Sequence, residues 1–315
     1  MYKWLFVLTL VGLIGCKNTR KERDNQAGSL LATGIFVLGI AQDAGFPQAD
    51  CRKNCCKDAW NNPELRRHAT CLALFDSLEN KYWLFEATPD IKFQMNHFQK
   101  MTAEQSPDLA GIFLTHAHVG HYTGLMHLGH EIMGAKGVPV YSMPRMRTFL
   151  SENGPWSQLV DFKNIALQNL SADSTIQLNE RLAVTPFRVP HRDEFSETVG
   201  YKIVTPKAAY LFIPDINKWN LWDRNIEDEI AKVDYAFVDG TFFENGEIPG
   251  RDMSQIPHPF IEESMSIFEK LSDEEKAKIH FIHFNHTNPA LQSGSEARAQ
   301  ILGAGFNIAE EGAQF

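Results

Sequence analysis

The chain has 315 residues, of which 43% are hydrophobic and 22% charged, and its formal net charge at pH 7 is -9. This is the composition of an ordinary globular protein, and the length allows one large domain with a good core. The sequence has no basic stripe, so nucleic acid is not an expected partner. It also has no internal repeat and no composition shift that would indicate a second folded domain.

The first fifteen residues have the pattern of a secretory signal. They carry one charge, on Lys3, and an apolar run over residues 4–14 that is too short to span a bilayer as a stable helix. Cys16 follows and closes a tetrapeptide that resembles a bacterial lipobox, in which the cysteine is acylated. We expect a signal peptide over residues 1–15, an acylated Cys16 with a flexible tether over residues 16–33, and a folded domain over residues 34–315. Such a protein would be exported and held by lipid on the periplasmic side of a bacterial membrane, the outer rather than the inner one.

Strands and helices alternate along the rest of the chain. Apolar runs and turn signals predict strands over residues 34–40, 71–75, 81–86, 110–114, 138–141, 182–189, 199–205, 209–213, 235–238 and 278–284. Helical spacing predicts helices over residues 90–100, 122–133, 225–232, 259–271 and 295–302. No G-x-G-x-x-G follows the first strand, so a layered α/β sandwich fits this order better than a Rossmann fold.

Three histidines stand within six residues at the end of the strand predicted before residue 115. They are His116, His118 and His121, and neutral imidazole is a common ligand of divalent metals. Side chains at positions i and i+2 of an extended segment point the same way, so His116 and His118 can share one ion. His121 comes where the chain turns toward a helix, and it can face a second ion.

Further metal ligands are expected at the ends of other strands. His191 follows the strand predicted over residues 182–189, Asp215 follows residues 209–213, and His283 ends the strand over residues 278–284. Each residue alone is a weak signal. Four strand ends that all deliver His or Asp in one chain indicate a metal site.

The order of these residues resembles the metallo-β-lactamase superfamily, whose hallmark is H-x-H-x-D-H. Within that superfamily the chain is most similar to the B proteins of pyrroloquinoline-quinone biosynthesis. The matching segments are residues 44–48 with the cysteines after them, residues 238–243, residues 285–291 and residues 312–314. The resemblance covers essentially the whole chain after the tether and implies an αββα four-layer sandwich. It also implies one or two Zn²⁺ ions, or Fe, between the sheet edges.

The resemblance assigns roles to the candidate residues. His116, His118 and His191 would bind a first metal, and His121, Asp215 and His283 a second, with Asp215 bridging. The implied reaction is hydrolysis of a small-molecule ester, lactone or phosphoester by metal-bound hydroxide. Asp215 would position the nucleophile, and His286 and His258 are candidates for proton transfer or substrate contact.

Gly120 departs from the family pattern, because the usual residue at that position is an aspartate that binds the second metal. Glycine has no side chain to bind a metal, so the second metal site should be weakened. We still rank a metal-dependent hydrolase first. An iron-dependent oxygenase of cofactor biosynthesis, built on the two-histidine, one-carboxylate set, comes second. A non-catalytic binding lipoprotein with a degenerate site comes third. The oligomeric state stays open.

A separate cysteine cluster follows the first predicted strand. Cys51, Cys55 and Cys56 lie close together in the sequence, and in the family that the chain resembles a cysteine-rich loop here holds a structural zinc ion. His68 is the nearest candidate for a fourth ligand. Disulfide formation is the competing interpretation, because an exported protein meets an oxidising compartment.

Overall fold

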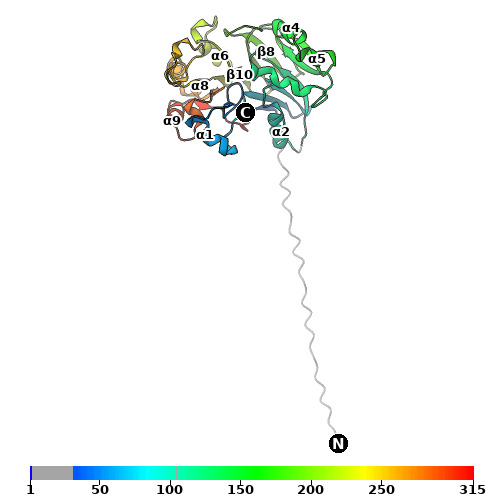
Figure 1. Cartoon of the computed structure of the whole chain (residues 1–315), viewed down its shortest axis with the longest axis horizontal. Coiled ribbons are helices and arrows are strands. Elements are labelled where there is room, and N and C mark those ends of the chain that lie inside the picture. Colours follow the sequence, from blue (N-terminus) through cyan, green and yellow to red (C-terminus); the bar gives the residue numbers. More distant parts are fainter. Residues whose placement is uncertain (2–30, 104) are drawn as a thin grey trace. The chain divides into compact units, whose positions relative to one another are not determined.

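Two β-sheets form the centre of the folded domain (Figure 1). The computed structural model describes residue 1, residues 31–103 and residues 105–315, and residues Leu31–Phe315 form one compact unit. The predicted signal peptide, Cys16 and most of the tether lie outside the described residues. None of the helices in the described part of the chain is long and apolar enough to cross a membrane.

The first sheet has six strands that follow one another in chain order. They are β1 (Gly34–Gly39), β2 (Cys71–Asp76), β3 (Lys81–Phe85), β4 (Asp108–Phe113), β5 (Val138–Ser142) and β6 (Ile165–Asn169). The β1–β2 and β2–β3 pairs are antiparallel, whereas β3 to β6 run parallel.

The second sheet has seven strands, again in chain order across the sheet. They are β7 (Ile176–Gln177), β8 (Ala183–Arg188), β9 (Val199–Val204), β10 (Ala209–Ile213), β11 (Tyr235–Asp239), β12 (Ile279–Ile282) and β13 (Asn307–Ile308). Strands β7 to β10 pair antiparallel, and β10 to β13 pair parallel. The parallel strands of both sheets therefore end at a common edge, where their following loops can meet.

Helices cover the outer face of each sheet, with α4 and α5 on one side of the domain and α8 and α9 on the other in Figure 1. The α-helices are α1 (Asn54–Asn61), α2 (Ile91–Met101), α3 (Val119–Tyr122), α4 (Pro144–Glu152), α5 (Trp156–Asp161), α6 (Ile226–Ile230), α7 (Ile261–Ile267), α8 (Asp273–Ala277) and α9 (Glu296–Gly303). Short 3₁₀ turns are η1 (Pro63–Leu65), η2 (Thr123–Leu128), η3 (Trp219–Leu221), η4 (Met253–Gln255), η5 (Phe268–Lys270) and η6 (Pro289–Leu291).

Strand β2 shows how the layers are built, because it is buried on both faces. Leu72 and Leu74 face the core between the two sheets, whereas Ala73 and Phe75 face the core under α2, α4 and α5. The period of two along a strand sends neighbouring residues to opposite faces. The predicted αββα four-layer sandwich is confirmed.

Two predicted helices differ from the structure. Residues 122–133 were expected to form one helix, but the chain forms α3 and the 3₁₀ turn η2 there. The cause is local: the Gly124 amide donates to the carbonyl of Ala87 at 2.8 Å, which ties the segment to the loop after β3. The helix predicted over residues 259–271 is α7, tightened at its end into η5. Helix α1 was not predicted, because its sequence was interpreted as a cysteine-rich loop.

Candidate metal centre

The loops at the common edge of the sheets bring the six predicted ligands together. His116 and His118 follow β4 and His121 lies in α3; His191 follows β8, Asp215 follows β10, and His283 follows β12. All are buried except His118, whose side chain is 16% exposed. The chain leaves β12 through His283, which adopts a positive φ of 69°.

A first group of ligand atoms belongs to His116, His118, His191 and Asp215, which each place one atom within 4.8 Å of the others. Nδ1 of His118 lies 2.7 Å from Nε2 of His116 and 3.2 Å from Nε2 of His191. Oδ2 of Asp215 lies 3.4 Å from Nε2 of His116 and 3.2 Å from Nε2 of His191. Three ring nitrogens and a carboxylate oxygen that converge in this way form a donor set suited to Zn²⁺.

A second group shares Asp215 and adds His121 and His283. Nε2 of His121 and Nε2 of His283 are both buried, and neither has a hydrogen-bond partner within the described residues. A buried polar atom without a partner costs about 1–3 kcal/mol. A bound cation removes that cost, so the residues present fit a metal ion here as well.

Protein oxygens hold the outward-facing nitrogen of most of these rings. Glu86, which directly follows β3 and has a positive φ of 88°, lies 3.1 Å from Nδ1 of His121 and accepts from the hydroxyl of Thr115 at 2.5 Å. Similar contacts join Thr115 to His116 at 2.9 Å, Thr241 to His283 at 3.0 Å, Asn217 to His191 at 3.2 Å and Glu194 to His118 at 3.0 Å. Such contacts orient a metal-binding imidazole and select its tautomer.

These orienting residues were not predicted from the sequence. Glu86 and Asp239, the acid that contacts His258, stand at the ends of strands, as the predicted ligands do. Their position at a strand end was the only signal that the sequence offered for them. Thr115, Asn217 and Thr241 carry no such signal, because a hydroxyl or amide beside a loop is common in any sequence.

Burial and neighbouring charge set the protonation of the ligands. Burial lowers the pKa of His116 and of His283 well below the usual value, so both are neutral and able to bind a cation. Burial opposes ionisation of Asp215, but the charges of His191 and His258 hold the pKa of its carboxyl well below the usual range. Two neutral imidazoles, those of His116 and His283, therefore stand beside the ionised carboxylate of Asp215.

His258 reaches the centre from the loop before α7. Its Nδ1 lies 2.9 Å from Oδ2 of Asp239 and 3.2 Å from Oδ1 of Asp215, and these three residues form a third close group. Burial by itself would lower the pKa of His258, but the charges of Asp239 and Asp215 raise it to about 9. A protonated imidazole held by two carboxylates beside a metal group is placed to donate a proton.

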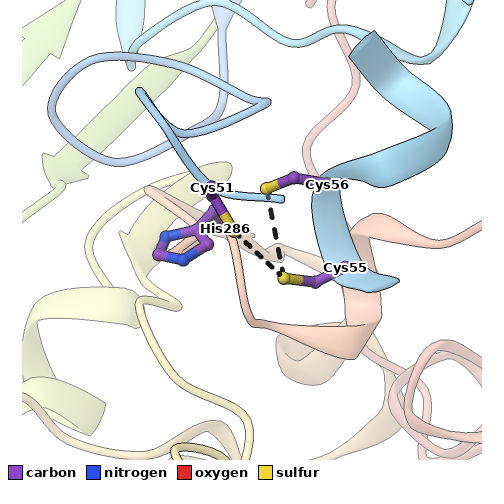
Figure 2. Close-up of side chains that lie close together, drawn as sticks. All are labelled: Cys51, Cys55, Cys56 and His286. Carbon is purple, nitrogen blue, oxygen red and sulfur yellow. Dashed lines mark hydrogen bonds between the residues drawn. The ribbon is translucent and has the colours of Figure 1, made fainter. Parts of the chain in front are cut away.

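The cysteine cluster forms a separate site, drawn in Figure 2. Cys51, Cys55, Cys56 and His286 each place one ligand atom within 4.8 Å of the others. The Cys51 and Cys55 sulfurs lie 3.8 Å apart and those of Cys55 and Cys56 4.0 Å apart, too far for a disulfide. Burial raises the pKa of the Cys55 thiol and raises that of Cys56 to about 12. These thiols are therefore protonated at neutral pH unless a cation holds them as thiolates.

Three expectations about this region are corrected. His68 is not the fourth member of the group: its Nδ1 lies 3.1 Å from Glu311 Oε2 and its ring stacks on Phe93. His286 takes that place, and it therefore lies with the thiols instead of serving the metal centre as a catalytic group. The disulfide interpretation also fails for the four cysteines in the described residues, which are all free.

Comparison with known proteins gives the class of this fold and site. The sequence profile of the Beta-lactamase superfamily domain matches residues 82–281. The chain therefore belongs to the β-lactamase superfamily.

Several known proteins align with this chain over nearly their whole length. Coenzyme PQQ synthesis protein B of Methylorubrum extorquens strain PA1 is 25% identical over 303 residues, which cover 88% of this chain and 98% of the relative. The crystal structure of zinc-bound PqqB from Methylobacterium extorquens aligns with a TM-score of 0.73 and 24% identity over 89% of this chain and 99% of that one. A diphosphatase of the PhnP family aligns with a TM-score of 0.62 and 22% identity, over 90% of this chain and 97% of that one. These two structures share the fold.

Proposed function

We propose that the chain is a metal-dependent hydrolase that cleaves a small-molecule ester, lactone or phosphoester. The observation that carries this proposal is the pair of ligand groups that share Asp215, with the proton donor His258 beside them. His116, His118, His191 and Asp215 would hold a first divalent ion, and His121, Asp215 and His283 a second. An ion bound there lowers the pKa of water and polarises the bond to be cleaved.

The protein's own residues supply the remaining steps. The ionised Asp215 accepts a hydrogen bond from the attacking water and so orients it. His258 donates a proton to the leaving oxygen, and Asp239, which accepts from Nδ1 of His258 at 2.9 Å, holds the ring with Nε2 free for that transfer. Asp239 is itself fixed by the Thr241 hydroxyl, which donates to its Oδ1 at 2.7 Å.

A variant at His258 tests the proton transfer separately from metal binding. We expect His258→Gln to keep the metal content of the wild type and to lose about 10²- to 10⁴-fold in turnover of an aryl phosphodiester, ester or lactone. Metal analysis of protein purified without chelators and initial rates with these three probes measure both effects. His116→Ala should lose the first ion together with turnover.

The matched control is His130→Gln, which changes an exposed imidazole that stacks on Phe162 away from the centre. It should leave metal content and rate unchanged. A metal-free wild type, or a His258→Gln variant as fast as the wild type, contradicts the proposed mechanism.

One observation favours a second function. His121, Asp215 and His283 form a two-histidine, one-carboxylate group of the kind that binds Fe(II) in oxygenases, and the relative named above is a coenzyme PQQ synthesis protein. We propose an iron-dependent oxygenase of cofactor biosynthesis as the alternative. Turnover that requires iron and consumes oxygen supports this alternative, whereas equal hydrolysis under anaerobic conditions supports the hydrolase.

We also propose that Cys51, Cys55, Cys56 and His286 bind a structural zinc ion. Three sulfurs and an imidazole within 4.8 Å of one another form one of the usual donor sets of such sites. Attachment to a membrane through Cys16 stays a prediction from the first sixteen residues.

A further inference from the structure

Gly120 lies against the backbone of a distant residue. A Cβ atom at position 120 would stand 2.4 Å from Cα of Asp43, 2.9 Å from its carbonyl oxygen and 3.0 Å from its Oδ1. Real Cβ atoms do not approach backbone so closely, so residue 120 has to be glycine while Asp43 keeps its place. The aspartate that the superfamily usually carries at this position is excluded for the same reason.

The loop that carries Asp43 is fixed beside the second ligand group. It follows β1, and the Gln42 amide donates to the carbonyl of Phe284 at 2.8 Å, while the Phe284 amide donates to Ile40 at 2.8 Å. Phe284 directly follows the ligand His283. Asp43 itself adopts a left-handed φ of 46°, a conformation that aspartate and asparagine tolerate better than most residues.

The carboxylate of Asp43 lies where the side chain of an aspartate at position 120 would begin. Within the described residues, Asp43 has neither a hydrogen-bond donor nor a cation on its side chain. Its carboxylate is therefore free for a ligand, and Gly120, against which it lies, directly precedes the ligand His121.

We propose that Asp43 supplies, from the loop after β1, the carboxylate ligand of the second ion that the chain lacks at Gly120. Oδ1 of Asp43 stands 3.0 Å from the point where a side chain at 120 would begin, so it enters the same pocket from the opposite loop. This inference rests on the proposed metal centre. It implies that the second site is rebuilt from another loop instead of being lost.

Asp43→Asn is the sharpest test, because asparagine keeps the size of the side chain, tolerates the left-handed backbone and lacks the charge. We expect this variant to hold one ion fewer than the wild type, or to bind that ion at least about tenfold more weakly. Equilibrium dialysis against Zn²⁺ measures the number and affinity of the ions. Absorption of the Co²⁺-substituted protein gives a second readout, in which the bands of one site should disappear.

Asp50→Asn is the matched control, since Asp50 is an acid of the same loop whose 91% exposed side chain pairs with Arg52 at 3.6 Å. It should bind metal as the wild type does, and circular dichroism should show all three proteins folded. Equal ion number and equal affinity in the wild type and Asp43→Asn overturn this inference alone. A wild type that binds no metal overturns the proposed function and this inference with it.

Discussion

Buried carboxylates decide the charge of the centre. Glu86, Asp215 and Asp239 are all at most 4% exposed, and each lies against an imidazole. An unpaired buried charge is very costly, so these acids can persist only with their partners in place. A buried polar atom without a partner is also costly, and for this reason the inward-facing Nε2 atoms of His121 and His283 fit a cation.

A half-buried acid, Glu247, gives a pH prediction away from the metal centre. Glu247 accepts hydrogen bonds from the Phe243 amide at 2.7 Å and from the Thr287 hydroxyl, but burial outweighs both and raises its pKa to about 7 from the usual value of 4.5. Its folded pKa exceeds its unfolded pKa, so folding favours the protonated acid. The contribution of Glu247 to stability is therefore full below pH 4.5 and falls as the pH rises to about 7.

The side chain introduced by Glu247→Gln cannot ionise, so this variant should not lose stability in this way as the pH rises. Relative to the wild type, its free energy of unfolding should rise by on the order of 2 kcal/mol between pH 4.5 and pH 8, as measured by urea unfolding at both values. Glu269→Gln, which changes an exposed acid of η5, is the control and should follow the wild type. Parallel profiles for Glu247→Gln and the wild type would contradict the assigned pKa.

Elements with a strong local pattern were predicted well. Helix α2 was expected over residues 90–100 and spans Ile91–Met101, and the hairpin of β2 and β3 lies where its turn signal placed it. The segment after His121 was predicted wrongly, although its apolar residues have helical spacing. There a backbone contact with the loop after β3 overrides the local preference, and a contact of this kind leaves no periodic trace in the sequence.

Gly124 is the residue on which that contact depends. A Cβ atom there would lie 2.0 Å from the carbonyl oxygen of Thr88, so Gly124→Ala should push η2 from the loop and destabilise the protein by about 1–3 kcal/mol. It should also weaken metal binding, because His121 lies three residues before. Urea unfolding and metal content measure the two effects.

Gly303→Ala is the matched control, since a Cβ atom at the end of α9 meets nothing within 4 Å. It should be neutral or slightly stabilising, because alanine favours the helix more than glycine does. A Gly124→Ala variant as stable as this control would show that the loop shifts without cost.

On the scale of the whole molecule, the thiol site joins distant parts of the chain. Cys51, Cys55 and Cys56 come from the loop and helix after β1, and His286 comes from the segment after β12. An ion bound by all four would hold these segments together. It would stabilise the folded state because the unfolded chain has no preformed site.

Cys55→Ala tests this link. The variant should contain one zinc ion fewer than the wild type and lose a few kcal/mol of stability at saturating metal, measured by metal analysis and by thermal unfolding with and without chelator. Cys71→Ala removes a thiol that lies on β2 outside the group, and it should leave the metal content unchanged. Equal metal content in Cys55→Ala and the wild type would mean that the group is a set of free thiols.

The sequence by itself determined the layered fold and the residues gathered at the sheet edge. Strand and helix periods are local properties of the sequence, so the elements can be predicted from one chain. The position of a ligand at the end of a parallel strand can be predicted as well, because such strands end at the same edge of a sheet. Only the tertiary structure decided which distant residues complete each site: His286 joins the cysteines in place of His68, and Asp43 lies against Gly120. Those choices depend on loops that meet across the fold, and the packing that brings them together has no local signature in the sequence.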